Sequence, residues 1–159
     1  MLAGAMMFHK VLCAVDFSSE SRRALEIAAQ LAKDANAPLV VVHVWQPAQW
    51  AAAEVQLAPG VIQDLLDAEH AQLATWRETA CALRGADVEV RFLTGAPWDQ
   101  IVGLARADQA IDLIVMGTHG RTGLQHVLLG SVAEKVVRHA PCAVLVVRAT
   151  AEATATPGS

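Results

Sequence analysis

The sequence predicts an α/β fold, with one open sheet of five parallel strands in the order 3-2-1-4-5 and helices on both faces. Five short apolar segments alternate with four helical ones along the chain, as in parallel sheets with right-handed crossovers. Most strand segments are continuously apolar, as expected for strands covered on both faces. The 159 residues fit one domain, which we place at residues 8–148, with disordered tails at 1–7 and 149–159.

The first strand and helix are predicted close to the N-terminus. Residues 10–15 form a nearly continuous apolar run that ends at Asp16. Ser18 or Ser19 can cap the following helix, because a serine side chain accepts a hydrogen bond from a free amide of the first turn. We expect this helix to end at about residue 35.

A second strand and a long helix follow. Residues 38–45 are rich in β-branched side chains, which favour a strand. The poorly patterned connection 46–59 leads to a helix over about 61–83, and Gly85 is placed to let the chain leave it. The apolar stripe predicted for this helix comprises Ile62, Leu65, Leu66, Leu73, Trp76, Ala80 and Leu83.

The second half of the chain continues the alternation. Residues 88–93 alternate in polarity, which suits an edge strand or a strand with one wetter face. Residues 113–116 and 143–147 are the fourth and fifth predicted strands. The helix that starts near Pro97 has the stripe Trp98, Ile101, Val102 and Ala105. The last helix ends at Pro141, and its predicted buried face is Val132, Ala133, Val136, Val137 and Ala140.

Three glycines and a serine after the fourth strand predict a phosphate site. Gly117, Gly120, Gly130 and Ser131 follow the pattern Gly-x2-Gly-x9-Gly-Ser. Glycine tolerates positive φ and lets amides approach an anion without an intervening Cβ, and a helix that opens at Ser131 presents further free amides. Asp16 and Gly117 end the strands between which the predicted order reverses, where ligands of such sheets bind. Ligand-free glycine turns and helix-capping roles for Asp16 and Ser131 are the alternatives.

Composition and charge exclude several classes of function. The formal net charge is −4 with scattered basic residues, so we expect no nucleic-acid partner. No apolar stretch reaches the roughly 20 residues that span a bilayer, and residues 1–7 lack the pattern of a secretory signal, so we expect no membrane partner. Cys13, Cys81 and Cys142 form no pairing framework, which favours reduced thiols in the cytoplasm. The histidines show no metal-site spacing, and we predict no metal held by the protein alone.

Several segments together resemble the universal stress protein family, in particular its ATP-binding, UspA-like members. The similarity covers about residues 8–148 and implies a Rossmann-like fold, similar to that of adenine nucleotide alpha hydrolases, and a homodimer. The segments that carry it are Val15-Asp16-Phe17-Ser18, His43-Val44, Met116-Gly117-Thr118-His119-Gly120-Arg121, Leu128-Leu129-Gly130-Ser131-Val132-Ala133, Pro141-Cys142 and Val144-Leu145-Val146-Val147-Arg148.

The resemblance implies ATP as ligand and a role for individual positions. Asp16 would lie beside the nucleoside or its metal, the backbone of Val44 would bond the adenine edge, and Gly117 and Gly120 would hold ribose and phosphate. Mg²⁺ would be held mainly by phosphate oxygens and water, with Asp16 in reach through a water. The amides of Gly130, Ser131 and Val132 and the Ser131 hydroxyl would take the β- and γ-phosphates. The complete predicted site is Ala14, Val15, Asp16, Val44, Met116, Gly117, His119, Gly120, Arg121, Gly130, Ser131, Val132 and Ala133.

Two positions depart from the family's nucleotide-binding pattern. Ala14 stands where some binders have proline, and Ala133 replaces a hydroxyl residue that adds a phosphate contact in some members. One lost hydrogen bond lowers affinity by roughly 0.5–1.5 kcal/mol, so binding should be weakened rather than abolished. Among the histidines, His43 is interpreted as a hydrogen-bonded core residue. His119 lies in the glycine loop, where it either bonds phosphate or orients the loop.

The sequence lacks the motifs of nucleotide-hydrolysing enzymes. It contains no P-loop pattern and no dinucleotide fingerprint after the first strand, and only His119 and Arg121 are candidates to assist chemistry near the loop. We therefore expect a regulatory nucleotide with slow or absent hydrolysis. The alternatives are a nucleotide-independent scaffold or chaperone-like interaction protein of the same fold, and a slow ATPase. The apolar strand Ala143–Val147 lies at the predicted sheet edge, which favours a homodimer through this strand.

Overall fold

The computed structural model of the chain describes residues 7–46, 59–119 and 129–148, and the structural findings below concern these residues. The tails predicted at 1–7 and 149–159 and the connection predicted at 46–59 lie almost wholly outside them. The elements in chain order are β1 (Val11–Val15), α1 (Ser19–Asp34), β2 (Leu39–Trp45), α3 (Pro59–Arg84), β3 (Glu89–Thr94), α4 (Pro97–Ala107), β4 (Leu113–Gly117), α5 (Ser131–His139) and β5 (Ala143–Val147).

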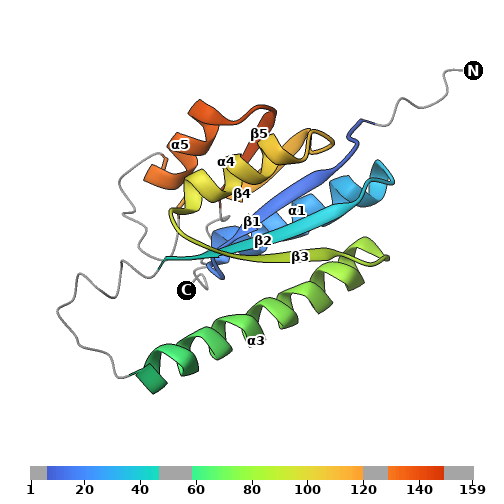
Figure 1. The fold of residues 1–159 in the computed structure, drawn as a ribbon. Helices are drawn as coiled ribbons and strands as arrows, with labels where there is room; N and C mark the ends of the chain where they lie inside the picture. Colours follow the sequence, from blue (N-terminus) through green and yellow to red (C-terminus); the bar gives the residue numbers. More distant parts are fainter. Residues whose placement is uncertain (1–6, 47–58, 120–128, 149–159) are drawn as a thin grey trace, which may run out of the picture.

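The five strands form one parallel sheet in the order β3-β2-β1-β4-β5 (Figure 1). The predicted fold class and strand order are therefore confirmed. Strand order reverses between β1 and β4, and both strands run with their carboxyl ends toward the same edge of the sheet. In the register of these neighbours, Ala14 of β1 lies opposite Met116 of β4 and Val42 of β2.

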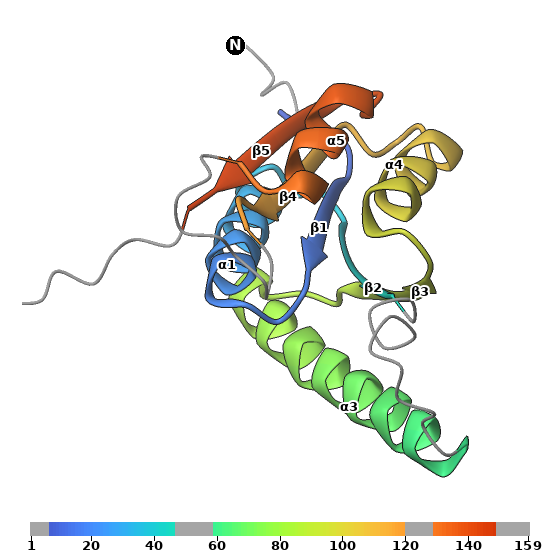
Figure 2. The same ribbon diagram turned by 90° about the vertical axis from the view of Figure 1, so that its left-hand side faces the viewer.

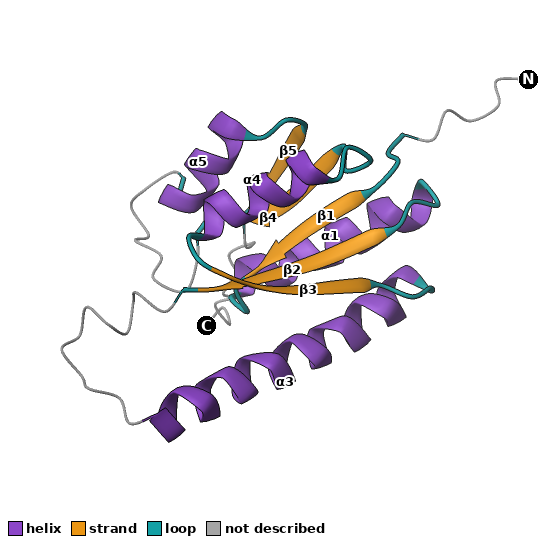
Figure 3. Cartoon of the chain, viewed as in Figure 1, coloured by secondary structure: helices purple, strands orange, loops and turns teal. Residues whose placement is uncertain are grey.

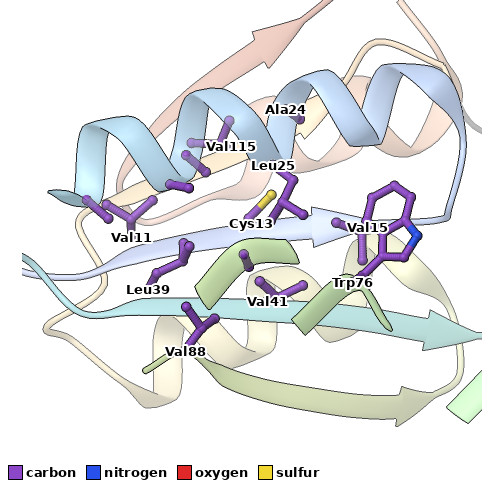
Figure 4. Close-up of a cluster of buried hydrophobic side chains, with 14 of the residues drawn as sticks. Val11, Cys13, Val15, Ala24, Leu25, Leu39, Val41, Trp76, Val88 and Val115 are labelled. Carbon is purple, nitrogen blue, oxygen red and sulfur yellow. The ribbon is translucent and has the colours of Figure 1, made fainter. Parts of the chain in front are cut away.

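Helices cover the sheet on both faces, and each face has its own core (Figures 2 and 3). The side chains of Val11, Cys13 and Val15 pack with α1 and α3 (Figure 4). The alternate β1 residues Leu12 and Ala14 pack with α4 and α5. Because β1 is buried on both faces, its sequence is continuously apolar, which is the pattern that predicted a central strand.

The long helix α3 is only partly covered by the rest of the domain. Its 26 residues span about 39 Å, whereas strands of five to seven residues span about 17–24 Å. Its N-terminal half therefore extends away from the sheet (Figure 2). Ile62 and Leu83, which were predicted in the apolar stripe, are 38% and 39% exposed, while Leu73, Trp76 and Ala80 are buried as predicted.

Helix α5 buries a narrower face than its sequence predicts. Ala133 and Val136 are buried, but Val137 is 49% exposed, so its predicted burial is wrong. The reason is that α5 lies over the edge of the sheet, where only one side of the helix meets α4 and β5. None of the described helices is long and apolar enough to cross a membrane.

Candidate functional site

Residues from four separate segments meet at the carboxyl edge of the central strands. Ala14, Val44 and Met116 end up on the same face of the sheet, in one apolar cluster with the start of α5. This convergence follows from parallel topology, since strands that end together place their last side chains together. Val15 differs, because its side chain is buried in the opposite core with α1 and α3. The site residues in this cluster are Ala14, Val44, Met116, Val132 and Ala133.

Asp16 organises the turn between β1 and α1. Its Oδ1 atom accepts hydrogen bonds from the backbone amide of Ser18 at 3.1 Å and from the Ser18 hydroxyl. The Ser18 hydroxyl in turn accepts a hydrogen bond from the amide of Ser21 and so caps α1, which identifies Ser18 as the predicted cap. The structural role that sequence analysis left open for Asp16 is therefore present.

Gly117 is required for close packing rather than for an unusual backbone conformation. It is the last residue of β4, and the glycines with positive φ in the described segments are Gly85 and Gly95. Gly117 therefore does not use the positive φ that glycine tolerates. An ideal Cβ at Gly117 would instead lie 2.7 Å from the Cβ of Glu20, in the first turn of α1. The absent side chain lets β4 and α1 approach each other.

Thr118 fixes the start of α5 relative to the sheet. Its amide donates to the carbonyl of Val147 at 2.9 Å, and its own carbonyl accepts from the amide of Gly130 at 2.7 Å. The Gly130 amide, which the family resemblance assigned to phosphate, is thus engaged within the protein. A Cβ at Gly130 would lie 2.8 Å from the Thr118 oxygen, so a side chain is poorly accommodated there. Thr118 is 6% exposed, and nothing in the sequence pattern identified it.

Helix α5 opens with amides that point to the same edge of the sheet. Gly130 is the N-cap residue, and no side-chain hydrogen bond from a described residue caps the helix. Ser131, Val132 and Ala133 occupy its first three positions, where helix amides have no partner within the helix. Ser131 is exposed, as a ligand contact requires. Ala133 is 2% exposed and packs into the core, so only its backbone is available to a ligand.

The two predicted histidines occupy different places. His119 is half-buried, and its Nδ1 lies 3.1 Å from Oγ1 of Thr118, beside the start of α5. Gly120 and Arg121 lie outside the described residues. His43 is a buried core residue as predicted, with Nδ1 2.9 Å from the Val15 carbonyl oxygen and Nε2 2.8 Å from Oε2 of Glu69. Sequence analysis missed Glu69, because no local pattern links it to His43.

Carboxylates with displaced pKa values lie at the other end of the sheet. The Lys10 ammonium donates to Asp108 at 2.7 Å and thereby lowers the pKa of that carboxyl. Partial burial acts to raise the pKa of Asp112, but hydrogen bonds from His9 and the Lys10 amide outweigh it and lower the pKa overall. Both carboxylates lie between α4 and β4, at the amino end of the sheet, so these ion pairs secure the fold at the end opposite the candidate site.

Thiol and metal chemistry receive no support from the described segments. Burial raises the pKa of the Cys13 and Cys142 thiols, which keeps both protonated, and the three cysteines are unpaired. Within the described ranges, no group of three or more His, Cys, Asp or Glu side chains is arranged to hold a metal ion. Besides the Asp16 carboxylate, the His119 imidazole and the Ser131 hydroxyl, this edge presents backbone amides and apolar side chains.

These features define a doubly wound α/β domain with a helix N-terminus and small residues at the point where strand order reverses, a type of site that suits an anionic ligand. Residues 7–148 match the model of the universal stress protein family. The chain is 33% identical over 145 residues to universal stress protein MJ0531 of Methanocaldococcus jannaschii, covering 91% of this chain and 85% of that protein. The chain belongs to the universal stress protein family.

Solved structures support the same assignment. Universal stress protein UspA from Lactobacillus plantarum superposes with a TM-score of 0.74 at 28% identity, over 89% of this chain and 98% of that chain. A universal stress protein crystallised in complex with cAMP superposes with a TM-score of 0.67 at 31% identity, over 90% of this chain and 98% of that one. Universal stress proteins that resemble this chain thus include one that binds an adenine nucleotide.

Proposed function

We propose that this protein binds ATP as a regulatory ligand in the stress response. The observation that carries the proposal is the start of α5, which the hydrogen bond from the Gly130 amide to the Thr118 carbonyl holds next to the end of β4. Helix amides in this position suit a phosphate group, because they add hydrogen-bond donors to the positive end of the helix dipole. The similar structure that holds cAMP supports an adenine nucleotide as the ligand.

The described residues fit such a ligand. The half-buried Val44 would provide apolar surface for adenine in front of the buried Met116, and the Val44 backbone would bond the adenine edge. Ser131 and the amides after it would hold phosphates, and the Gly117 backbone at the end of β4 would lie against the ribose. Mg²⁺ would be held mainly by phosphate oxygens and water, with Asp16 in reach through a water, since these segments contain no carboxylate cluster for a protein-held ion.

Regulation rather than catalysis is the role that we propose for the nucleotide. Near the start of α5, the His119 imidazole contacts the Thr118 hydroxyl, and it would bond phosphate or orient the glycine loop. A dedicated hydrolase needs a base or a group that positions water. The slow-ATPase alternative requires phosphate release that Asp16→Ala or His119→Ala abolishes. The scaffold alternative requires partner binding that is the same with and without nucleotide.

A charge placed at Ser131 separates binding from folding. A carboxylate at the first position of a helix interacts favourably with the positive end of the helix dipole, so Ser131→Glu should keep or raise the free energy of unfolding. The same charge repels phosphate and should weaken binding of ATP with Mg²⁺ by about tenfold or more. Gln109→Glu makes the same charge change on the exposed loop before β4 and serves as the matched control. Calorimetry measures affinity, and urea unfolding measures stability.

Ligand retained by the purified protein provides a second test. Mass spectrometry of small molecules released on denaturation should identify ATP or a related adenine nucleotide. Millimolar ATP should also raise the midpoint of thermal unfolding, because a ligand that binds only the native state stabilises it. Absence of both binding heat and thermal shift in the wild type would refute the proposed function and leave the scaffold alternative.

We further propose that the protein acts in the cytoplasm as a homodimer through β5. Its unpaired thiols agree with a reducing compartment. In the described sheet β5 pairs with β4 on one side only. Leu145 of β5 is 37% exposed, and Val137 of helix α5 is 49% exposed. A second copy of the chain would cover this apolar edge.

A further inference from the structure

Five rings lie together on the α1 and α3 side of the sheet, and we call them the ring cluster: Phe17, His43, His70, Trp76 and Phe92. Phe17 stacks on His43 with ring centroids 4.3 Å apart and an interplanar angle of 26°, and it meets Trp76 at 5.4 Å. His43 lies 5.6 Å from Phe92, which stacks on His70 at 3.9 Å. The ring cluster thus joins the β1–α1 turn to β2, β3 and α3.

Phe17 has a backbone conformation that its own side chain disfavours. Its φ is 65°, in the left-handed region where a bulky residue is uncommon. The neighbours on both sides require this geometry, because Asp16 accepts the amide of Ser18 and Ser18 caps α1. Such conformations persist when the surrounding structure fixes them. Here the stacking on His43 and the contact with Trp76 provide that constraint.

His43 lies between two oxygen atoms, and this arrangement fixes its protons. The Val15 carbonyl oxygen can only accept, so Nδ1 must carry a hydrogen. On the other side, Nε2 lies 2.8 Å from Oε2 of Glu69. The side chains of His43 and Glu69 are 5% and 16% exposed. A bare nitrogen lone pair would repel the carboxylate, whereas an additional proton on the pair makes the contact attractive.

We propose that His43 is a positioning residue for the nucleotide site, because the proton that it shares with Glu69 holds the Phe17 ring in place. Phe17 in turn fixes the turn that carries Asp16. We call the pair of His43 and Glu69 the lock. The proposal rests on the proposed nucleotide binding, since Asp16 and Val44 flank this arrangement at the same edge. When the pH rises and the proton is lost, the attraction between β2 and α3 at this point becomes repulsion. Phe17 then loses its constraint, and affinity for the nucleotide falls.

Other charged groups approach the ring cluster from the elements around it. Asp16 lies in the turn itself, and Arg22 of α1 places its guanidinium 4.9 Å from the centroid of Trp76. His70 of α3 contacts Phe92 rather than the lock. On β3, the charged neighbours Glu89 and Arg91 pair with each other. Among these groups His70 is the other imidazole of the ring cluster, so His70→Gln provides the control.

The test is the pH profile of affinity for ATP with Mg²⁺, measured by calorimetry on the full chain. The range runs from about pH 5 to about pH 8, where histidine changes charge. His43→Asn keeps an N–H donor for the Val15 carbonyl but cannot take up a proton, and Glu69→Gln keeps the shape and removes the charge. Protonation of the ATP phosphates is common to all variants, so its effect cancels when each profile is divided by that of the wild type.

The ratio of wild-type affinity to His43→Asn affinity should fall by about fivefold or more from the low to the high end of this range, a typical coupling between linked sites. His43→Asn and Glu69→Gln should lose that dependence, and His70→Gln should keep it. If both lock variants retain the wild-type profile, the proposal is overturned.

A measurement without ligand separates this proposal from the proposed function and needs no variant to fold. The ring nitrogen signals of His43 in the wild type should show both nitrogens protonated at low pH, and the amide signals of Phe17 and Ser18 should shift with the same midpoint. Turn signals that stay constant while His43 titrates would overturn the positioning role. If the wild type binds no nucleotide at any pH, the proposed function fails, and this titration alone decides whether the lock exists.

Discussion

Gly117 and Glu20 bring the end of β4 and the first turn of α1 closer than any side chain at position 117 would permit. An ideal Cβ on Gly117 would lie 2.7 Å from the Cβ of Glu20, 3.2 Å from the carbonyl carbon of Glu20 and 3.2 Å from the amide nitrogen of Ser21. Two of these three nearest neighbours are backbone atoms, which a rotamer change cannot move. The contact therefore sets the distance between two elements that frame the candidate site.

Gly117→Ala should lower the free energy of unfolding by about 1–3 kcal/mol, as overpacking of a close contact does. Gly103→Ala is the matched control, because Gly103 is exposed in α4 and a Cβ there meets nothing within 4 Å. The control should gain roughly 0.5–1 kcal/mol from improved helix propensity. Urea unfolding of both variants measures the difference, and equal stabilities would contradict the role given to Gly117.

Arg84 hydrogen-bonds two loops at the amino end of the sheet, the one before β2 and the one before β3. Its Nε and Nη2 donate to the carbonyl of Ala37 at 3.1 and 2.8 Å, and its Nη1 donates to the carbonyl of Asp87 at 2.8 Å. A lysine ammonium lacks the planar fork that serves both carbonyls. Arg84→Lys should therefore cost about 1.5–3 kcal/mol of stability, in the range of a hydrogen bond to a charged group.

The control for Arg84 is the same substitution at an exposed helix position. Arg23 makes one ion pair, with Glu26 at 3.0 Å, and its side chain is 47% exposed. Arg23→Lys should change stability by less than about 0.5 kcal/mol. Chemical unfolding of both variants tests the difference, and a similar small effect at both positions would show that the Arg84 contacts contribute little.

The fold was predictable because its signals are local and repeated. Residues 11–15 and 113–116 are continuously apolar, and each central strand with that property is covered on both faces. The helix stripes were predictable where a helix lies over the sheet, as at Trp76. They failed at Ile62 and Val137, because exposure there depends on how far a helix extends beyond its neighbours.

The site was predictable in position but not in its hydrogen bonds. Parallel topology alone places Asp16 and Gly117 at one edge. By contrast, the bond from Gly130 to Thr118 and the ion pair of His43 with Glu69 join residues that share no sequence pattern. Both depend on the packing of whole elements, which a single sequence does not encode in any short window.

Acid should destabilise the protein through Asp112. Hydrogen bonds lower the pKa of this carboxyl in the folded state, whereas in the unfolded chain it titrates near its usual value of about 3.9. The contribution of Asp112 to the free energy of unfolding is therefore complete above the pKa of the unfolded chain. It is lost as the pH falls through the pKa of the folded state. The Asp112 side chain is 33% exposed, so water screens its charge. We therefore expect the carboxylate to contribute about 1 kcal/mol to the free energy of unfolding at neutral pH.

Asp112→Asn should accordingly lower stability at neutral pH by this amount and reduce the loss of stability below about pH 4. Asp64→Asn, at an exposed carboxylate of α3, is the control and should leave the profile unchanged. Urea unfolding at several pH values measures both. An Asp112→Asn profile parallel to that of the wild type would show that this carboxylate does not contribute to acid unfolding.

Leu145→Lys tests the proposed dimer through β5. Leu145 is 37% exposed on the edge strand, and a second copy that pairs with this edge would cover it. A lysine charge in that interface must lose water without a partner, so the variant should be monomeric where the wild type is dimeric.

Leu83→Lys is the control, since Leu83 is 39% exposed on α3 and should tolerate lysine. Sedimentation equilibrium measures the mass of each protein, with thermal unfolding as a check that both variants fold. A monomeric wild type, or a Leu145→Lys dimer as stable as the wild type, would show that β5 is not the interface.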